Sequence, residues 1–451
     1  MVAALCWSRR AAQGSGADDL LVQQSGEPVS LSCERLQFVT LMSNSPAQAN
    51  SNRPATLDIR LILEAVDFVL GSAARPVELH EPRFGERERE LVLDCIDTNW
   101  VSSAGKYVTR FEEMCAAATG ARHGVAIVNG TAALHAALLL EGVQTNDEVL
   151  LPAVTFVATA NAVSHAGAIP HFVDSTWDTL GLDPAGLEAH LDDIAVRRNG
   201  EWVNRHTGRR LRAVVPVHIF GHPVDVAALG AVAAKYDLVV VEDATESLGS
   251  TLKGQACGTF GHSAVLSFNG NKIVTTGGGG MIVTNDDEYA RRARHFTSTA
   301  KKPHLWAFEH DEVGYNYRLP NLNAALGCAQ MERLLAMVDA KRELAERYLA
   351  AFNKFSGASV YREPAGARSN YWLNTLVLDP ECAGARDALL SALHEHGVRA
   401  RPLWTPMHML PMYRNCPRSP LRVAEDMYAR CINLPSSPFL AAGGQPSANK
   451  S

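Results

Sequence analysis

Residues 264–284 read AVLSFNGNKIVTTGGGGMIVT, and this stretch guides the interpretation of the rest of the chain. It contains a short apolar run typical of a β-strand, a polar turn that carries Lys272, four consecutive glycines and a second apolar run. Consecutive glycines let a backbone approach a ligand closely, and a lysine held against such a backbone can act as a nucleophile toward carbonyl groups. The alternative is a solvated lysine in an ordinary turn, because the pattern alone is weakly specific.

The composition is that of an ordinary globular protein. Of its residues, 47% are hydrophobic and 20% are charged. The length of 451 residues allows a large domain with a smaller companion. The net charge of −6 gives no electrostatic reason to expect a nucleic acid or an anionic membrane as a partner. The nine cysteines are dispersed without a C-x-x-C pair, so we expect reduced thiols and neither a disulfide framework nor a metal site.

Two apolar stretches resemble targeting or membrane segments. Near the N-terminus the run VAALCW precedes its arginines, which is the reverse of the order in a signal peptide. The uncharged run at 149–173 is long enough to span a bilayer, but Pro152 and Pro170 interrupt it. We therefore expect a cytoplasmic protein without a membrane segment.

The chain divides by composition into four parts. Residues 1–53 are rich in Ser, Gln, Ala and Asn and are expected to be poorly ordered. Residues 54–320 are expected to form N-terminal helices and a large domain, 321–440 a smaller α+β domain, and 441–451 a tail. Met42 lies within the first part, so the start of the protein at Met1 is in doubt and residues 1–41 are expected to be dispensable.

The large domain alternates strands and helices. Strand-like runs such as GVAIV, DEVLLPAVTF, PHFVD, RAVVPVHIFG and DLVVVEDA are apolar and β-branched without polar alternation, which is typical of strands buried on both faces. Helical patterns separate several of them, so the fold class is α/β with a mostly parallel sheet. Outside this block the spacing predicts helices over 55–70 and 86–97, and one long helix near 323–352.

Chemically capable residues follow several of these strands. In parallel α/β sheets ligands bind beyond the carboxyl ends of the strands. Each residue has an ordinary explanation as a helix cap, a core side chain or a turn residue. Together they offer an anion site at a helix start, a flat apolar surface, a buried carboxylate and a hydroxyl near Lys272. In chain order these residues are Gly130, Thr131 and Ala132, then Phe156, then Glu242 and Asp243, then Ser267.

This set matches the needs of pyridoxal 5′-phosphate. The aldehyde of this cofactor needs a lysine for a Schiff base, and its ring nitrogen needs an aspartate to stay protonated. Its phosphate needs backbone N–H groups and hydroxyls, and its ring face needs an aromatic partner. Burial and neighbouring charges in such a site would lower the pKa of the lysine.

The ordered motifs NGTAAL, PAVTFVATANAV, VEDATESLGS, SFNGNKIVTTGGGG and GYNYRLPNLNAALG resemble the sugar-nucleotide aminotransferases of the DegT/DnrJ/StrS family, over roughly residues 77–438. The resemblance implies pyridoxal phosphate as cofactor, the fold of type I enzymes with a seven-stranded sheet, and a homodimer with shared active sites. It implies that Lys272 forms the Schiff base and that Asp243 pairs with the ring nitrogen.

The same resemblance assigns the other site residues. It implies phosphate binding by Gly130, Thr131, Ala132 and Ser267 with Asn269 close by, and stacking of Phe156 on the ring. It also implies that two residues of GYNYR reach the neighbouring subunit's site, Asn316 toward phosphate and Arg318 toward substrate. Glu246 occupies a place beside the ring that is often His or Gln in the family, so it departs from the pattern, and a glutamate there could tune a proton on the cofactor oxygen.

Two further stretches resemble the branch that serves legionaminic-type nonulosonic acids. They are HEPRFGERERELVLDCIDTNWVSSAGKYVTRFE, with Ser103, and RPLWTPMHMLPMY, with His408, and both residues are expected to face the sugar, although solvated loops are a close alternative. The resemblance implies amination of C4 in a nucleotide-linked 4-keto-6-deoxy sugar, often 2-acetamido, for surface polysaccharide or nonulosonic acid synthesis. Glutamate would be the amino donor, and Lys272 would carry the proton in both halves of the reaction.

Two other functions remain alternatives at this point. One is a pyridoxal phosphate-dependent sugar dehydratase of the same fold, in which histidine replaces the lysine or an iron–sulfur cluster is added. Lys272 and the dispersed cysteines argue against it. The other is a non-catalytic regulatory protein of the same fold, which the complete lysine, aspartate and phosphate set argues against. The sequence leaves UDP and GDP open as the nucleotide.

Overall fold

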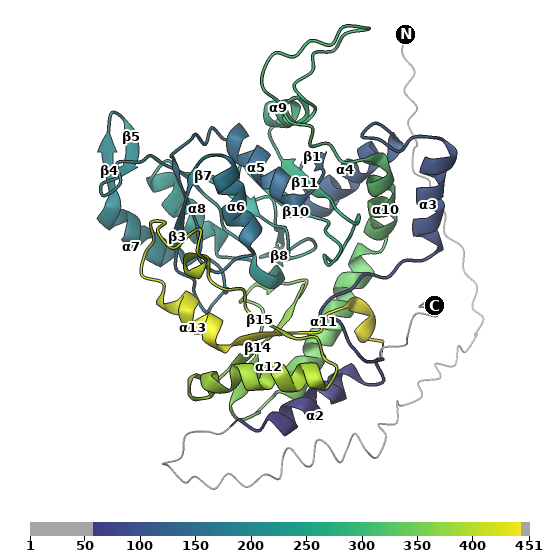
Figure 1. The fold of residues 1–451 in the computed structure, drawn as a ribbon, viewed down its shortest axis with the longest axis vertical. Helices are drawn as coiled ribbons and strands as arrows, with labels where there is room; N and C mark the ends of the chain where they lie inside the picture. Colours follow the sequence, from purple (N-terminus) through teal and green to yellow (C-terminus); the bar gives the residue numbers. More distant parts are fainter. Residues whose placement is uncertain (1–56, 443–451) are drawn as a thin grey trace, which may run out of the picture. The chain divides into compact units, whose positions relative to one another are not determined.

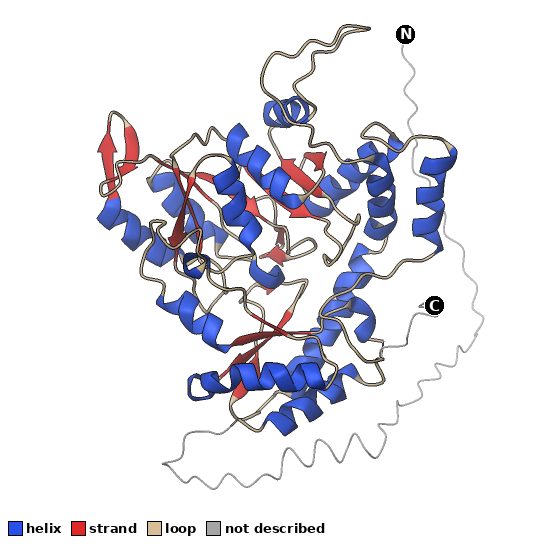
Figure 2. Ribbon diagram, viewed as in Figure 1, coloured by secondary structure: helices blue, strands red, loops and turns tan. Residues whose placement is uncertain are grey.

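The computed structural model describes residues 57–442. The predicted dispensable segment 1–41 therefore lies outside the described residues. Within them, no helix is both long and apolar enough to cross a membrane. Figure 1 shows the elements in chain order, and Figure 2 shows the strands with the helices around them.

A seven-stranded sheet forms the centre of the large domain. Its order is β1-β11-β10-β7-β6-β2-β3, and β11 is antiparallel to both β1 and β10 while the other pairs are parallel. The predicted mostly parallel α/β fold is therefore confirmed. The strands are β1 (His123–Ile127), β2 (Glu148–Pro152), β3 (Ile169–Val173), β6 (Leu211–Val214), β7 (Val239–Asp243), β10 (Ser263–Ser267) and β11 (Gly280–Thr284).

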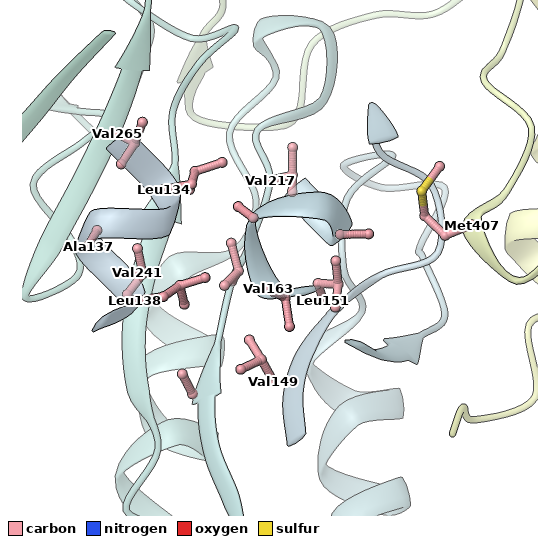
Figure 3. Close-up of a cluster of buried hydrophobic side chains, with 14 of the residues drawn as sticks. Leu134, Ala137, Leu138, Val149, Leu151, Val163, Val217, Val241, Val265 and Met407 are labelled. Atoms are coloured by element: carbon pink, nitrogen blue, oxygen red, sulfur yellow. The ribbon is translucent and has the colours of Figure 1, made fainter. Parts of the chain in front are cut away.

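Apolar helices cover this sheet. Helices α5 (Gly130–Leu140) and α6 (Val157–His165) contribute Leu134, Leu138 and Val163 to a core that also contains strand valines. Figure 3 shows these side chains beside Met407, which belongs to the C-terminal part of the chain. The Met407 N–H also donates to the Ala153 carbonyl at 2.9 Å, so the C-terminal segment is anchored at the end of β2.

The remaining helices of this part are α3 (Glu86–Asp97), α4 (Lys106–Thr119), α7 (Pro184–Ile194), α8 (Val226–Lys235), α9 (Asp287–Thr297) and α10 (Asn321–Met331). Two small antiparallel pieces complete it, β4 (Ala195–Arg198) with β5 (Glu201–Asn204), and β8 (Thr251–Leu252) with β9 (Gln255–Ala256) and β13 (Ala367–Arg368).

The C-terminal part has an antiparallel sheet in the order β12-β14-β16-β15. Its strands are β12 (Ala358–Val360), β14 (Asn374–Leu378), β15 (Arg401–Pro402) and β16 (Cys431–Leu434), and its helices are α11 (Leu334–Ala351), α12 (Arg386–Glu395) and α13 (Arg422–Arg430). Helix α2 (Ile59–Leu70) joins this core through residues such as Ile62 and Val66. Within residues 57–442 the first helix thus packs with the last third of the chain and not with the large sheet.

The single long helix expected near 323–352 is wrong, because the structure has two helices, α10 and α11, with a break at Glu332 and Arg333. Helix α10 packs against α3 and α4, whereas α11 packs against α2, so the two serve different cores. The Glu332 carboxylate at the break binds Arg87 and Arg110. No proline or glycine marks the position, so tertiary contacts determine it.

Candidate active site

Lys272 lies in a cavity of about 380 Å³ at the carboxyl ends of the parallel strands. Strand β7 ends there at Asp243, and β10 ends there at Ser267. The start of α5 and the start of α6 complete the wall. The predicted residues in the lining are Gly130, Thr131, Phe156, Asp243, Glu246, Ser267, Asn269 and Lys272.

The Lys272 side chain is held between an acid and an aromatic ring. Only 11% of the side chain is exposed, and Nζ lies 3.4 Å from Glu246 Oε1 and 3.9 Å from the centroid of the Trp372 ring. An amine in this position is shielded from bulk water yet borders the cavity. It can therefore react with a carbonyl group that enters the cavity.

Asp243 is a buried carboxylate whose orientation is fixed by two groups. Thr159 Oγ1 donates to Oδ2 at 2.8 Å, and the Thr245 N–H donates to Oδ1 at 3.2 Å. Thr155 Oγ1 lies 2.9 Å from Thr159 Oγ1 and extends the chain of hydroxyls. A carboxylate presented in this way can stabilise a protonated nitrogen in the cavity, as the sequence predicted for Asp243.

The predicted anion site is formed by the first residues of α5. The N–H groups of a helix start have no intrahelical partner and attract an anion. A Cβ added to Gly130 would lie 3.1 Å from Ser267 Cβ, so glycine allows the close approach of α5 to the end of β10. Ala132 is not among the lining residues, and its N–H donates to Asn129 Oδ1 at 2.8 Å. A phosphate would therefore compete with the capping side chain of Asn129 for the Ala132 N–H.

The glycine run is explained by a second close approach. A Cβ on Gly280 would lie 2.5 Å from the Asn129 carbonyl oxygen. Any side chain at this position would therefore displace the backbone of Asn129. Because Asn129 caps α5, a larger residue at 280 would push the helix start away from the cavity. The glycines therefore position the anion site as well as the turn around Lys272.

Two tryptophans in the cavity wall were missed by the sequence analysis. Trp372 and Trp404 are stacked with centroids 6.3 Å apart, and the Phe156 ring is tilted against Trp404 at 6.1 Å. Trp372 Nε1 donates to the Asn271 carbonyl at 2.8 Å, and buried Lys341 Nζ donates to the Trp372 carbonyl at 3.1 Å. The tryptophans follow Lys272 by 100 and 132 residues, and no spacing pattern links them to it. The only sequence signal was their place in the motifs SNYWLN and RPLWT.

The carboxyl of Glu246 has a raised pKa. The pKa of this carboxyl is raised from 4.5 to about 7, mainly by burial and also by the charge of Asp243, while Lys272 and the Phe220 N–H lower it. The Phe220 N–H donates to Oε2 at 2.8 Å. The group thus gains or loses a proton near neutral pH beside the reactive amine, which suits an acid–base role in the site.

We predict that Glu246→Gln stabilises the cofactor-free protein in alkaline solution. The pKa of Glu246 is higher in the folded than in the unfolded protein, so the ionised carboxyl destabilises the folded state. This destabilisation is absent below about pH 4.5, grows between pH 4.5 and 7, and is constant above pH 7. A shift from 4.5 to about 7 corresponds to about 3 kcal/mol, which a neutral glutamine avoids. Urea unfolding at several pH values should show the variant more stable near pH 8 and equal to the wild type near pH 4. The exposed control Glu343→Gln should show no such trend, and a pH-independent difference for Glu246→Gln would contradict the assignment.

Besides Ala132, four predicted site residues lie outside the lining of this cavity in the single chain. Ser103 and Asn316 are exposed. His408 is buried and its Nε2 lies 3.1 Å from Glu425 Oε1. Arg318 donates to Glu112 Oε1 at 2.6 Å. The structure therefore does not bring these four side chains to Lys272, and their roles stay predictions.

The residues present fit pyridoxal 5′-phosphate. The cavity has an amine at Lys272, a buried oriented carboxylate at Asp243, a helix start with Gly130 and Thr131 for a phosphate, and the ring of Phe156 in its wall. The volume of about 380 Å³ is in the range of small-molecule sites. The lining therefore contains a counterpart for each polar group that this cofactor requires.

Comparisons with known proteins agree with this site. Residues 82–445 match the model of the DegT/DnrJ/EryC1/StrS aminotransferase family. The chain is 35% identical to the GDP-perosamine synthase of Caulobacter vibrioides over 80% of this chain and 93% of that protein. It is 30% identical to the dTDP-4-dehydro-2,3,6-trideoxy-D-glucose 4-aminotransferase of Saccharopolyspora spinosa over 81% and 92%.

A solved structure has a similar fold. The aminotransferase TlmJ from Streptoalloteichus hindustanus superimposes with a TM-score of 0.72 and 30% identity, over 80% of this chain and 93% of that chain. Proteins of this family are pyridoxal phosphate-dependent sugar aminotransferases. With the lysine, the carboxylate and the anion site in place, the chain belongs to the DegT/DnrJ/EryC1/StrS aminotransferase family.

Proposed function

We propose that this enzyme transfers the amino group of glutamate to C4 of a nucleotide-linked 4-keto-6-deoxy sugar that carries a 2-acetamido group. The product would serve surface polysaccharide or nonulosonic acid synthesis. The observation that carries the proposal is that the shielded Lys272 amine and the oriented Asp243 carboxylate line the same cavity. A relative whose name describes a 4-aminotransferase for a 4-dehydro sugar supports position 4, and the legionaminic-type motifs support the sugar class.

Each residue of the site has a defined task in this reaction. Bound pyridoxal phosphate supplies a carbonyl group that accepts the amino group and a ring that withdraws electrons. Lys272 Nζ removes the proton from the glutamate α-carbon and later delivers a proton to C4 of the sugar. Asp243 holds the proton on the ring nitrogen through its fixed carboxylate. Phe156 and Trp372 line the cavity with apolar surface and limit the access of water to Lys272.

An assay with a panel of nucleotide 4-keto sugars tests the proposal. UDP- and GDP-linked sugars with and without the 2-acetamido group are each incubated with glutamate and the holoenzyme. We expect 2-oxoglutarate and an amino sugar in equal amounts for one member of the panel. A dehydrated sugar without an added nitrogen would identify the enzyme as a dehydratase and contradict the proposal.

We also propose that the active sites are shared between two subunits of a homodimer. Along the extended segment 315–318, side chains alternate between two faces. Tyr315 and Tyr317 are stacked at 4.8 Å and pack against His135 of their own chain. Asn316 and Arg318 occupy the other positions of the alternation, where Asn316 is exposed to a second subunit and Arg318 is held by Glu112.

Two properties of this region support a partner. Arg318 Nη1 is buried and has no hydrogen-bond partner within residues 57–442, although Nη2 binds Glu112. The loop after α9 projects from the top of the view in Figure 1. It exposes apolar side chains that a second copy could cover, namely Leu305 (91% exposed), Trp306 (77%), Phe308 (79%) and Val313 (85%).

Mixing two inactive variants tests the shared site. Lys272→Ala and Arg318→Ala proteins should each be inactive, because every site lacks one group. After subunit exchange, half of the dimers are mixed, and one of their two sites has both groups, so about a quarter of the wild-type activity should return. A mixture of Lys272→Ala with Asp243→Asn is the matched control and should stay inactive, because both changes affect the same chain's site. If exchanged mixtures with Arg318→Ala show no recovery, the loop serves its own chain.

A further inference from the structure

The indole ring of Trp372 faces the amine of Lys272. Nζ lies over the ring, 3.9 Å from its centroid. The face of an indole is negatively polarised and attracts a cation, and this attraction is stronger where water is excluded. Water has little access here, because Trp372 is 4% exposed and the Lys272 side chain is 11% exposed. The ring is therefore placed to bind the ammonium form of Lys272.

Hydrogen bonds fix the ring relative to Lys272. Trp372 Nε1 donates to the carbonyl of Asn271, the residue immediately before Lys272, at 2.8 Å. The Trp372 N–H donates to Asn370 Oδ1 at 2.8 Å, and the Asn370 amide donates to the Glu246 carbonyl at 2.8 Å. Asn370 is fully buried. The ring, the lysine and the glutamate thus belong to one hydrogen-bonded unit.

Two further contacts support this unit. A Cβ on Gly221 would lie 1.9 Å from Asn370 Oδ1, and φ at Gly221 is +93°, so a glycine is needed for Asn370 to reach Trp372. Buried Lys341 donates from Nζ to the Trp372 carbonyl at 3.1 Å. Any large apolar side chain could fill the cavity wall, whereas these bonds set the orientation of the ring.

The charged groups near the amine do not replace the ring. Within residues 57–442 Glu246 is the only carboxylate that forms an ion pair with Lys272. The pKa of Glu246, raised to about 7 by burial and by the charge of Asp243, leaves this carboxyl partly protonated near neutral pH. Burial and the charges of Lys341 and Lys272 lower the pKa of His80 well below its usual value, so His80 is neutral. The ring, in contrast, attracts an ammonium group at every pH.

We propose that the Trp372 ring binds the ammonium form of Lys272 between the two proton transfers of the reaction. The inference rests on the proposed function, in which Nζ serves both glutamate and the sugar. When Nζ takes a proton from a substrate carbon, its lone pair forms the new N–H bond and the C–H electron pair stays on the substrate. The resulting ammonium is a shielded charge, which is costly without a partner. The ring stabilises it and keeps it at the cavity until the proton is delivered.

Chemical labelling of the free amine tests this inference. The protein is loaded with pyridoxamine 5′-phosphate, which has no carbonyl group and leaves Lys272 free. Acetylation of Lys272 by acetic anhydride is followed over a range of pH by mass spectrometry, with the exposed Lys253 of the same molecules as internal standard. Only a neutral amine is acetylated. Trp372→Leu removes the attraction for the ammonium and should accelerate labelling roughly five-fold near neutral pH, but not in alkaline solution.

Two control variants accompany this measurement. Trp372→Phe keeps an aromatic face and loses only the indole N–H, so its labelling should resemble that of the wild type. Trp202→Leu removes an indole from β5, outside the lining of the cavity, and should have no effect. Unfolding temperatures establish that all variants are folded. Unchanged labelling in Trp372→Leu would overturn the inference. So would the same acceleration at every pH, or equal acceleration in Trp372→Phe, because the ring would then only cover the amine or donate a hydrogen bond.

The competing role of Trp372 is contact with the sugar. Trp372 also lines a second cavity, of about 720 Å³, which adjoins the one that contains Lys272. The reactions of the holoenzyme with glutamate and with the sugar are therefore followed separately by the absorbance of the bound cofactor. Because Lys272 acts in both, Trp372→Leu should slow both to a similar extent. A loss confined to the sugar reaction would overturn the inference. The labelling needs no sugar, so failure to find an accepted 4-keto sugar would count against the proposed function alone.

Discussion

Lys272→Ala protein is expected to fold normally and to lose amino transfer completely. Nζ is the group that can remove and return protons at the substrate carbons, since it borders the cavity 3.4 Å from Glu246. The lining offers no second lysine. Alanine leaves the anion site at Gly130 and the Asp243 carboxylate in place, so the cofactor should still bind without a covalent bond.

Two measurements check this result. Turnover with glutamate and the best sugar of the panel should fall to background for Lys272→Ala, while Lys235→Ala, an exposed lysine of α8, should retain wild-type rates. Borohydride treatment of the holoenzyme should attach the cofactor to the peptide that contains Lys272 and to no other peptide. Labelling of another lysine, or measurable turnover in Lys272→Ala, would assign the chemistry elsewhere.

Asp243→Asn is expected to lower the rate roughly a hundred-fold or more, because a neutral amide cannot stabilise a proton on the ring nitrogen. The substitution is nearly isosteric, and the Thr159 hydroxyl and the Thr245 N–H that hold Asp243 remain in place. The loss should therefore appear in kcat and not in the unfolding temperature.

The control for this change is Asp193→Asn, which removes an exposed carboxylate from α7. It should leave kcat unchanged. Wild-type-like rates in Asp243→Asn would mean that another carboxylate interacts with the ring nitrogen, and Glu246 would be the next candidate because it lines the same cavity.

Much of the site can be predicted from the sequence because the carboxyl ends of parallel strands lie at the same edge of the sheet. Strands β7 and β10 are adjacent and parallel, so Asp243 and Ser267 at their carboxyl ends meet at one edge. Continuous apolar runs identify such strands, and residues that follow them converge even when they are far apart in sequence. The same reasoning placed Gly130 and Thr131 at the start of α5, beside Lys272.

Other features depend on packing that no local pattern encodes. Trp372 and Trp404 reach the cavity because the C-terminal part packs against the large domain, through contacts such as Trp372 Nε1 to the Asn271 carbonyl. The break between α10 and α11 reflects two separate cores and has no glycine or proline signal. The second cavity lies between segments that are more than 300 residues apart in the chain, from Glu78 to Arg401, and only the folded chain shows it.

The central claim is that nitrogen moves from glutamate to C4 of a nucleotide-linked sugar at Lys272. The most direct test is incubation of the holoenzyme with ¹⁵N-glutamate and the accepted 4-keto sugar, followed by NMR of the product. We expect one ¹⁵N atom bonded to C4 for each 2-oxoglutarate formed, and none with Lys272→Ala protein. A product without ¹⁵N, or with ¹⁵N at another ring carbon, would contradict it.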